Sequence, residues 1–193
     1  MAELVFLKLG GSLITDKRTP LKPRRGVIRR VGREIREALD KSAGLQLLLG
    51  HGSGSFGHPV AEKYRVQEGL AASDDWWGYA ETAAIAARLN RLVSETLLAQ
   101  GIPALPLQPS ASALCHDGRL VRLDVAPLQE ALKRGLVPVV YGDVSFDTVR
   151  GSAVISTEQI FAYLAPYLQP SRVILAAHVD GVFTADPLRA AGS

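Results

Sequence analysis

The sequence has little cysteine, no long apolar run and no P-loop signature. Cys115 is the only cysteine among 193 residues, which excludes an internal disulfide and any metal site built from several cysteines. No apolar run approaches the roughly 18 residues that a membrane-spanning helix needs. No Gly-Lys pair occurs, so the P-loop signature is absent. We therefore expect a protein of the reducing cytoplasm, with no membrane partner and with Cys115 as a buried structural thiol.

Positive charge is in mild excess and is concentrated near the N-terminus. The chain is 47% hydrophobic and 21% charged, as in ordinary globular proteins, and its formal net charge is +3. A basic segment can bind nucleic acid, but no aromatic side chains alternate with these cations to stack on bases. We favour a solvated helix face beside a phosphate-facing loop and expect no nucleic-acid partner. The cations are Lys17, Arg18, Lys22, Arg24, Arg25, Arg29, Arg30, Arg33 and Arg36.

Short apolar runs alternate with amphipathic segments along the whole chain. This order predicts an α/β fold, a three-layer αβα sandwich with a central, mostly parallel sheet. The predicted strands are Leu4–Leu7, Leu45–Leu49, Ala104–Leu107, Leu136–Tyr141 and Arg172–Ala176, with a hairpin that joins Ala113–Cys115 to Leu120–Arg122 around Asp117-Gly118 and a further polar hairpin after Gly142-Asp143. The predicted helices are Gly26–Lys41, Val60–Tyr64, Tyr79–Gln100, Ala126–Arg134 and Glu158–Leu168.

Two glycine-rich loops follow the first two predicted strands, where α/β sheets bind ligands. The second, residues 52–57, formally matches the dinucleotide fingerprint, but residues 71–78 do not form the second strand with a terminal acidic residue that this fold requires. The first loop, Gly10-Gly11-Ser12, lies between Lys8 and Lys17. Glycines let backbone amides approach phosphate oxygens, and lysines neutralise charge that moves during phosphoryl transfer. Alone, Lys8 is equally well interpreted as a strand residue whose amine reaches solvent; together these features favour phosphoryl transfer.

Five segments carry a resemblance to a known family. The sequence resembles the amino acid kinase superfamily and, within it, the family of isopentenyl phosphate kinases, of which a histidine after the second glycine loop is the more discriminating mark. The segments are Lys8–Ser12, Gly52–Pro59, Gly142-Asp143, Ser156-Thr157 and Val179–Val182.

The resemblance implies ATP and Mg²⁺ as cofactors, isopentenyl phosphate as the acceptor, and a homodimer. It implies that Lys8 contacts the transferring phosphoryl group, that Lys17 stabilises the transition state, and that Asp143 orients both lysines. The remaining implied roles are ATP binding by Gly10, Gly11, Ser12, Gly54 and Asp180, and acceptor binding by Ser53, Gly54, His58, Ile155 and Ser156.

An acceptor that is already a phosphate fits the residues, because its second pKa of about 6 leaves it largely dianionic at neutral pH and no general base is needed. His58 then donates a hydrogen bond to that phosphate; the alternative is a histidine that caps a helix starting at Pro59. We interpret His51 as structural. The acceptor's apolar tail needs a slot in the protein. Eight residues are candidates for lining it, and the same residues also suit close helix packing or a dimer interface. They are Tyr64, Trp76, Trp77, Tyr79, Thr82, Ala83, Ile85 and Ala86.

The resemblance also implies two lobes. Residues 1–142 would form the acceptor lobe, and residues 143–193 would begin an ATP-binding lobe that is incomplete, because family members continue further. A related kinase with a fosfomycin-type or uridylate-type acceptor, and a non-catalytic phosphate-binding fragment, remain alternative functions.

Overall fold

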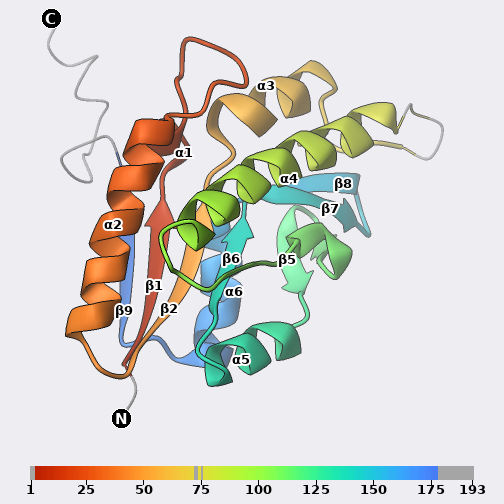
Figure 1. Ribbon diagram of the computed structural model, residues 1–193. Coiled ribbons are helices and arrows are strands. Elements are labelled where there is room, and N and C mark those ends of the chain that lie inside the picture. The colour runs from red at the N-terminus through yellow and green to blue at the C-terminus, as the bar shows by residue number, and fades with distance from the viewer. Residues whose placement is uncertain (1–2, 72–73, 75, 178–193) are drawn as a thin grey trace, which may run out of the picture.

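The computed structural model describes residues 3–71, 74 and 76–177, whose path is shown in Figure 1. The helices and strands run in the order β1 (Glu3–Leu9), α1 (Gly11–Ile14), α2 (Arg25–Lys41), β2 (Leu45–His51), α3 (Gly54–Lys63), α4 (Trp77–Leu98), β3 (Ala104–Pro106), the 3₁₀ turn η1 (Pro109–Ala111), β4 (Leu114–His116), β5 (Arg119–Arg122), α5 (Ala126–Lys133), β6 (Val137–Tyr141), β7 (Asp143–Asp147), β8 (Gly151–Ile155), α6 (Thr157–Leu168) and β9 (Arg172–Ala176).

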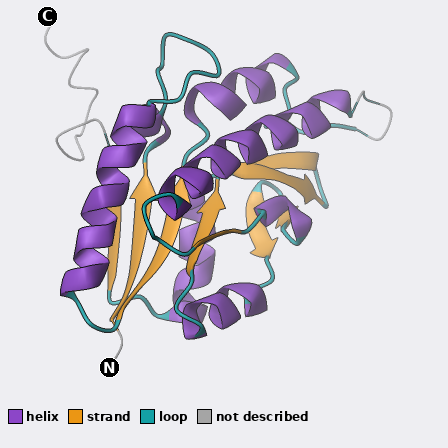
Figure 2. Cartoon of the chain, in the orientation of Figure 1, coloured by secondary structure: helices purple, strands orange, loops and turns teal. Residues whose placement is uncertain are grey.

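The strands form two sheets. The larger has the order β3-β6-β2-β1-β9 and all its pairs are parallel, which confirms the predicted parallel sheet. The smaller has the order β5-β4-β7-β8 and is mixed, because the two predicted hairpins supply antiparallel pairs. Since only Gly142 separates the end of β6 from the start of β7, the smaller sheet extends from the carboxyl edge of the larger one (Figure 2).

Helices cover both faces of the larger sheet, as the three-layer prediction requires. Alternate residues of β1 point to opposite faces: Val5 and Leu9 pack with α2 and α4, whereas Leu4 and Phe6 pack with α5 and α6. Figure 1 shows α2 and α4 in front of the sheet and α6 behind it. Within the described residues, no helix is long and apolar enough to cross a bilayer.

The helix that follows the second glycine loop starts earlier than predicted, at Gly54 instead of Val60. Pro59 inside this helix lacks the N–H that would bond to the Ser55 carbonyl one turn back. Leu21 supplies the missing donor: its backbone N lies 3.2 Å from the Ser55 oxygen. His58 therefore lies within α3, and the alternative in which it caps a helix starting at Pro59 is wrong.

The predicted hairpin and the buried thiol are both confirmed. Asp117 and Gly118, between β4 and β5, have φ angles of 49° and 77°, as expected of a two-residue type I′ turn. Cys115 is fully buried, and burial raises the pKa of its thiol. The ring of the neighbouring His116 forms a hydrogen bond with the Thr148 hydroxyl, at 2.7 Å.

Candidate active site

A cavity of about 590 Å³ lies at the carboxyl edge of the larger sheet, where β1 and β2 run into the two glycine loops. It gathers most of the site residues expected from the sequence. Its lining residues are Lys8, Gly10, Gly11, Ser12, Lys17, Pro20, Gly54, Ser55, His58, Pro59 and Ala177.

The two glycine loops touch through their backbones. A Cβ atom on Gly11 would lie 2.5 Å from the Gly54 nitrogen, and one on Gly52 would lie 2.9 Å from the Gly11 nitrogen. Gly54 also has a φ angle of +50°, a conformation that side chains other than glycine disfavour. Glycine is therefore required on both loops, because any side chain would push the loops apart.

Thr15 ties the loops together, and the sequence interpretation missed it. This side chain is fully buried. Its Oγ1 donates to the Gly11 carbonyl at 2.7 Å and accepts from the Ser55 backbone N–H at 3.0 Å. One hydroxyl thus bonds to a backbone group of each loop. The Gly11 carbonyl and the Ser55 N–H lie close enough to share it only because glycine lets the two loops approach each other.

Lys8 extends from β1 toward α6. In the parallel register it pairs with Gly50 of β2, whose missing side chain leaves room for Thr157 and Phe161. The Lys8 ammonium forms an ion pair with Glu158 in the first turn of α6. Burial by itself would raise the pKa of Glu158, but the hydrogen bond and charge of Lys8, together with hydrogen bonds at the start of α6, outweigh it and the pKa is lowered. The sequence interpretation missed this partner, although an acidic residue in the first turn of a helix beside the sheet edge was the available indication.

His58 and Ser55 present the polar side chains of α3 to the cavity. His58 is exposed there, whereas the Ser55 side chain is mostly buried. The Ser55 hydroxyl has no hydrogen-bond partner within the described part of the chain.

His51 is fully buried at the end of β2, which confirms that it is structural. Its Nδ1 lies 3.1 Å from the Gly52 carbonyl, and its Nε2 lies 3.2 Å from the Asn90 amide nitrogen. Nδ1 must donate and Nε2 must accept, so this network requires the neutral ring. Burial lowers the His51 pKa to about 4.

The other predicted site residues lie outside the cavity lining. Asp143 is almost fully buried and accepts from the backbone N–H groups of Ser110 at 3.1 Å and Val144 at 2.9 Å. Burial raises its pKa despite those bonds. Neither Lys8 nor Lys17 is among the hydrogen-bond partners of Asp143 in residues 3–177, so its role in orienting the lysines stays a prediction.

Three further predicted residues sit near the start of α6 and α3, and a fourth is not described. Ile155 is fully buried at the end of β8. Ser156 caps α6 by accepting from the Gln159 N–H at 3.1 Å. Ser53 is buried at the cap position of α3. Asp180 lies outside the described residues.

The cavity is equipped to bind and transfer phosphoryl groups. It combines two lysines, a histidine and the backbone amide of Gly54, which as the first residue of α3 has no acceptor within that helix. Amides and cations of this kind bind phosphate oxygens and stabilise charge that moves between them. A parallel α/β sheet that carries such a site at its carboxyl edge defines a class of small-molecule kinases.

The chain belongs to the amino acid kinase family, whose family model matches residues 3–191. It is similar to the isopentenyl phosphate kinase of Methanothermobacter thermautotrophicus, at 41% identity over 95% of this chain and 70% of that protein. The isopentenyl phosphate kinase of Methanocaldococcus jannaschii is 37% identical over 93% of this chain and 70% of its own length. Among solved structures, an isopentenyl phosphate kinase has a TM-score of 0.90 at 39% identity, covering 97% of this chain and 76% of that one.

Proposed function

We propose that this protein transfers the γ-phosphoryl group of ATP to isopentenyl phosphate, which yields isopentenyl diphosphate and ADP. The observation that carries the proposal is the cavity in which Lys8, Lys17 and His58 meet the two glycine loops. The similarity to isopentenyl phosphate kinases over nearly the whole chain supports the same acceptor.

The acceptor phosphate is proposed to bind over the start of α3. There it accepts from His58 and from the amide of Gly54. Both residues line the cavity, and His58 is exposed there, which supports this placement. Ser53 stays in the proposal as a residue that shapes the same turn, because its side chain lies under Gly57.

The ATP phosphates are proposed to lie over Gly10, Gly11 and Ser12, with Lys8 and Lys17 on either side of the transferring group. One acceptor oxygen attacks the γ-phosphorus, and the bond from that phosphorus to the β,γ-bridging oxygen breaks as ADP leaves. The acceptor is largely dianionic at neutral pH, so no proton has to be removed. The work of the site is to hold two anions in line and to neutralise their charge.

Mg²⁺ is part of the proposal as the companion of ATP. The described residues contain no group of three or more His, Cys, Asp or Glu side chains that could hold a metal ion. The cavity's donors are amides, amines and hydroxyls, which fit phosphate oxygens. Mg²⁺ commonly binds through substrate phosphates with one or two carboxylates, and it would supply further neutralisation of charge there.

The apolar tail is proposed to point toward the small core beside α3 and α4. Ala61, one helical turn after His58, packs in that core with Val66, Leu70 and Val144. The predicted tail-slot residues divide in the structure. Tyr64, Trp76, Tyr79 and Ala83 border this core, Ile85 packs into the larger core under α2, and Thr82 bonds to the Gly78 carbonyl at 2.7 Å.

Three further expectations, on the lobes, the oligomeric state and the location of the protein, complete the proposal. Residues 1–142 are proposed as the acceptor lobe and residues 143–193 as the beginning of the ATP lobe, in which Asp180 contacts the nucleotide. The protein is proposed to act as a homodimer, which sedimentation of the wild-type chain tests directly. A cytoplasmic location agrees with the single, buried Cys115.

An assay that couples ADP release to NADH oxidation tests the activity, with isopentenyl phosphate, uridylate and fosfomycin offered as acceptors. We expect turnover with isopentenyl phosphate and at least about a tenfold increase in its KM in His58→Ala, because one hydrogen bond to a charged phosphate is lost. Preferred turnover of uridylate or fosfomycin would assign the chain a different acceptor. Phosphate binding without any turnover would identify a non-catalytic binding module.

A further inference from the structure

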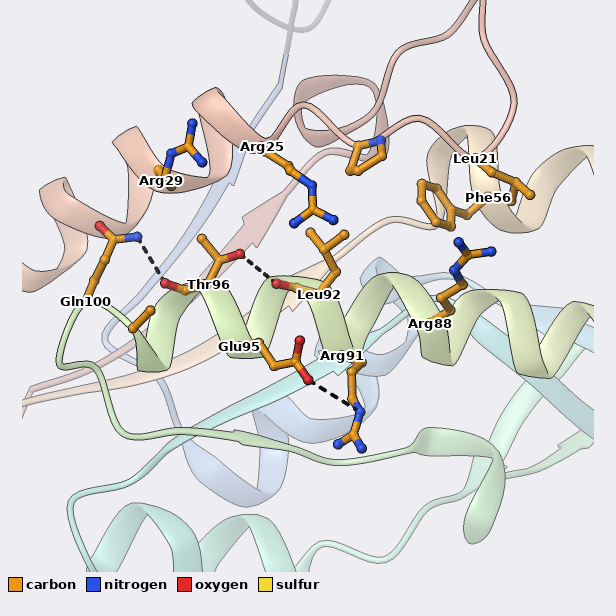
Figure 3. Close-up of a pocket in the computed structure, with 12 residues that line it drawn as sticks. Leu21, Arg25, Arg29, Phe56, Arg88, Arg91, Leu92, Glu95, Thr96 and Gln100 are labelled. Atoms are coloured by element: carbon orange, nitrogen blue, oxygen red, sulfur yellow. Dashed lines mark hydrogen bonds and ion pairs between the residues drawn. The ribbon is translucent and has the colours of Figure 1, made fainter.

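A second cavity, of about 570 Å³, lies between α2 and α4 (Figure 3). The loop of residues 15–24 lies between it and the candidate active site. Lys17 and Pro20 of this loop line the first cavity, whereas Leu21 and Pro23 line the second. We call the second cavity the arginine groove. Its lining residues are Leu21, Pro23, Arg25, Arg29, Phe56, Arg88, Arg91, Leu92, Glu95, Thr96, Ala99 and Gln100.

The charge in the arginine groove is strongly positive. Four guanidinium groups line it against one carboxylate, Glu95, which lies 3.6 Å from Arg91. Figure 3 shows Arg25 extending from α2 and Arg88 extending from α4 on either side of Leu92, while Arg91 turns away to Glu95. Within the described residues, no carboxylate pairs with Arg25, Arg29 or Arg88.

The unpaired arginines contrast with other arginines on the same helix. Arg30 pairs with Glu34 and Arg36 pairs with Asp40, each one turn further along α2. The residues one turn after Arg25 and Arg88 are Arg29 and Leu92. Arg25, Arg29 and Arg88 therefore have guanidinium groups that no carboxylate of the described residues neutralises, and these groups are free to bind an anion.

The groove also has an apolar side. Phe56 and Leu92 line it, and Leu21 contributes a partly exposed side chain. Phe56 is only 2% exposed, so its ring is not free to stack on a nucleic-acid base. The combination of apolar lining and unpaired guanidinium groups suits a ligand that has an anionic head and an apolar body.

We propose that the arginine groove binds a small amphiphilic organophosphate, meaning a phosphate or diphosphate ester that carries an apolar chain. Guanidinium groups bind phosphate through two parallel N–H···O bonds, and Arg25 and Arg88 can approach one head group from both helices. The apolar chain of the ligand then lies along Leu21 and Leu92, whose side chains are partly exposed. The cavity volume falls within the range of about 300–1,000 Å³ that is usual for small-molecule sites.

Occupation of the groove bears on the active site through a direct backbone contact. Leu21 lines the groove, and its N–H bonds at 3.2 Å to the carbonyl of Ser55, which lines the active-site cavity. A ligand that packs on Leu21 therefore touches the loop that carries Lys17. The groove is distinct from the acceptor site, and its binding can be measured without any reliance on kinase activity.

Calorimetric titration with geranyl diphosphate tests the proposal, with inorganic pyrophosphate as the head group alone. The test variant is Arg25→Gln/Arg88→Gln. The control is Arg119→Gln/Arg122→Gln on β5, which removes the same charge from exposed positions outside the groove. We expect the test variant to bind geranyl diphosphate at least about tenfold more weakly and the control to stay within about twofold of wild type. Pyrophosphate should bind more than about tenfold more weakly than geranyl diphosphate, because it buries no chain.

Four results would overturn the proposal. The first is equal binding by the test variant and wild type. The second is full displacement of geranyl diphosphate by isopentenyl phosphate, which would place the ligand in the active site. The third is binding only to phosphatidylglycerol vesicles, which would make the groove a membrane contact. The fourth is a wild-type dimer that the test variant dissociates, without ligand binding, which would assign the groove to a second copy of the chain.

Discussion

The active-site cavity and the arginine groove are similar in volume, about 590 and 570 Å³, but they are built differently. Backbone makes the first: two glycine loops in direct contact, tied by Thr15, with cations placed around them. Side chains on two helices make the second. A site built from backbone is rigid and tolerates few substitutions, whereas a site built from exposed side chains accepts substitutions without loss of the fold.

Replacement of Lys8 in the active-site cavity should give the largest effect. Lys8→Met keeps the length and apolar part of the side chain but removes the charge that would neutralise the transferring phosphoryl group. We expect kcat to fall by about 10³-fold, as when a preorganised electrostatic contact is lost, with a melting temperature close to that of wild type. Steady-state kinetics with ATP and isopentenyl phosphate, beside thermal unfolding, measure both. A kcat within threefold of wild type would show that Lys8 is not part of the chemistry.

Two glycine-to-alanine variants compare the active site, which is built from backbone, with α2, one of the helices whose side chains form the arginine groove. Gly54→Ala places a methyl group against Thr15 and the Gly11 carbonyl at a positive φ angle, and we expect it to cost about 3 kcal/mol of unfolding free energy through strain and overpacking. The matched control is Gly26→Ala in α2, where a Cβ meets nothing within 4 Å. It should stabilise the protein by about 0.5–1 kcal/mol. Urea unfolding of both variants gives the comparison, and equal effects would contradict it.

The free energy of unfolding should depend on pH through His51, which is buried at the end of β2. Its pKa is lowered from 6.5 to about 4 in the folded chain, so the unfolded chain binds the proton more readily. Its contribution to stability is present above pH 6.5 and is lost as the pH falls toward 4, by about 3 kcal/mol in total.

Urea unfolding at several pH values between 7 and 4 measures this dependence. His51→Gln, which keeps a polar group but does not titrate, should be less stable at pH 7 and lose less stability on acidification. The same slope in His51→Gln and wild type would assign the acid sensitivity to other groups.

Thr15 gives the smallest expected effect and tests the tie between the loops. Thr15→Val keeps the shape but leaves the buried Ser55 N–H without its acceptor, at a cost of about 1–3 kcal/mol of unfolding free energy. We expect a similar loss in kcat, about tenfold, because the loops that hold the two phosphates shift. Thr15→Ser keeps the hydroxyl and should recover most of the activity. If Thr15→Ser and Thr15→Val are equally impaired, the methyl group and not the hydroxyl matters.

Much of the fold and part of the site could be predicted from local patterns. Apolar runs of strand length, the Asp117-Gly118 turn and the glycine loops have short-range causes, so their positions were accurate to a few residues. The start of α3 was not predictable in this way, because the carbonyl that Pro59 leaves unpaired is satisfied by Leu21, which is distant in sequence. Glu158 was missed for the same reason: it is 150 residues from Lys8 along the chain.

The sequence by itself determined where phosphate-binding chemistry is available: lysines beside glycine loops at the ends of strands, one thiol and no P-loop. Only the tertiary structure decided which side chains meet there. Thr15 lies 40 residues from Ser55, and Arg25 and Arg88 stand on separate helices, so no local pattern pairs them. The reason is physical: backbone preferences act over a few residues, whereas contact between distant side chains depends on how buried apolar faces dock.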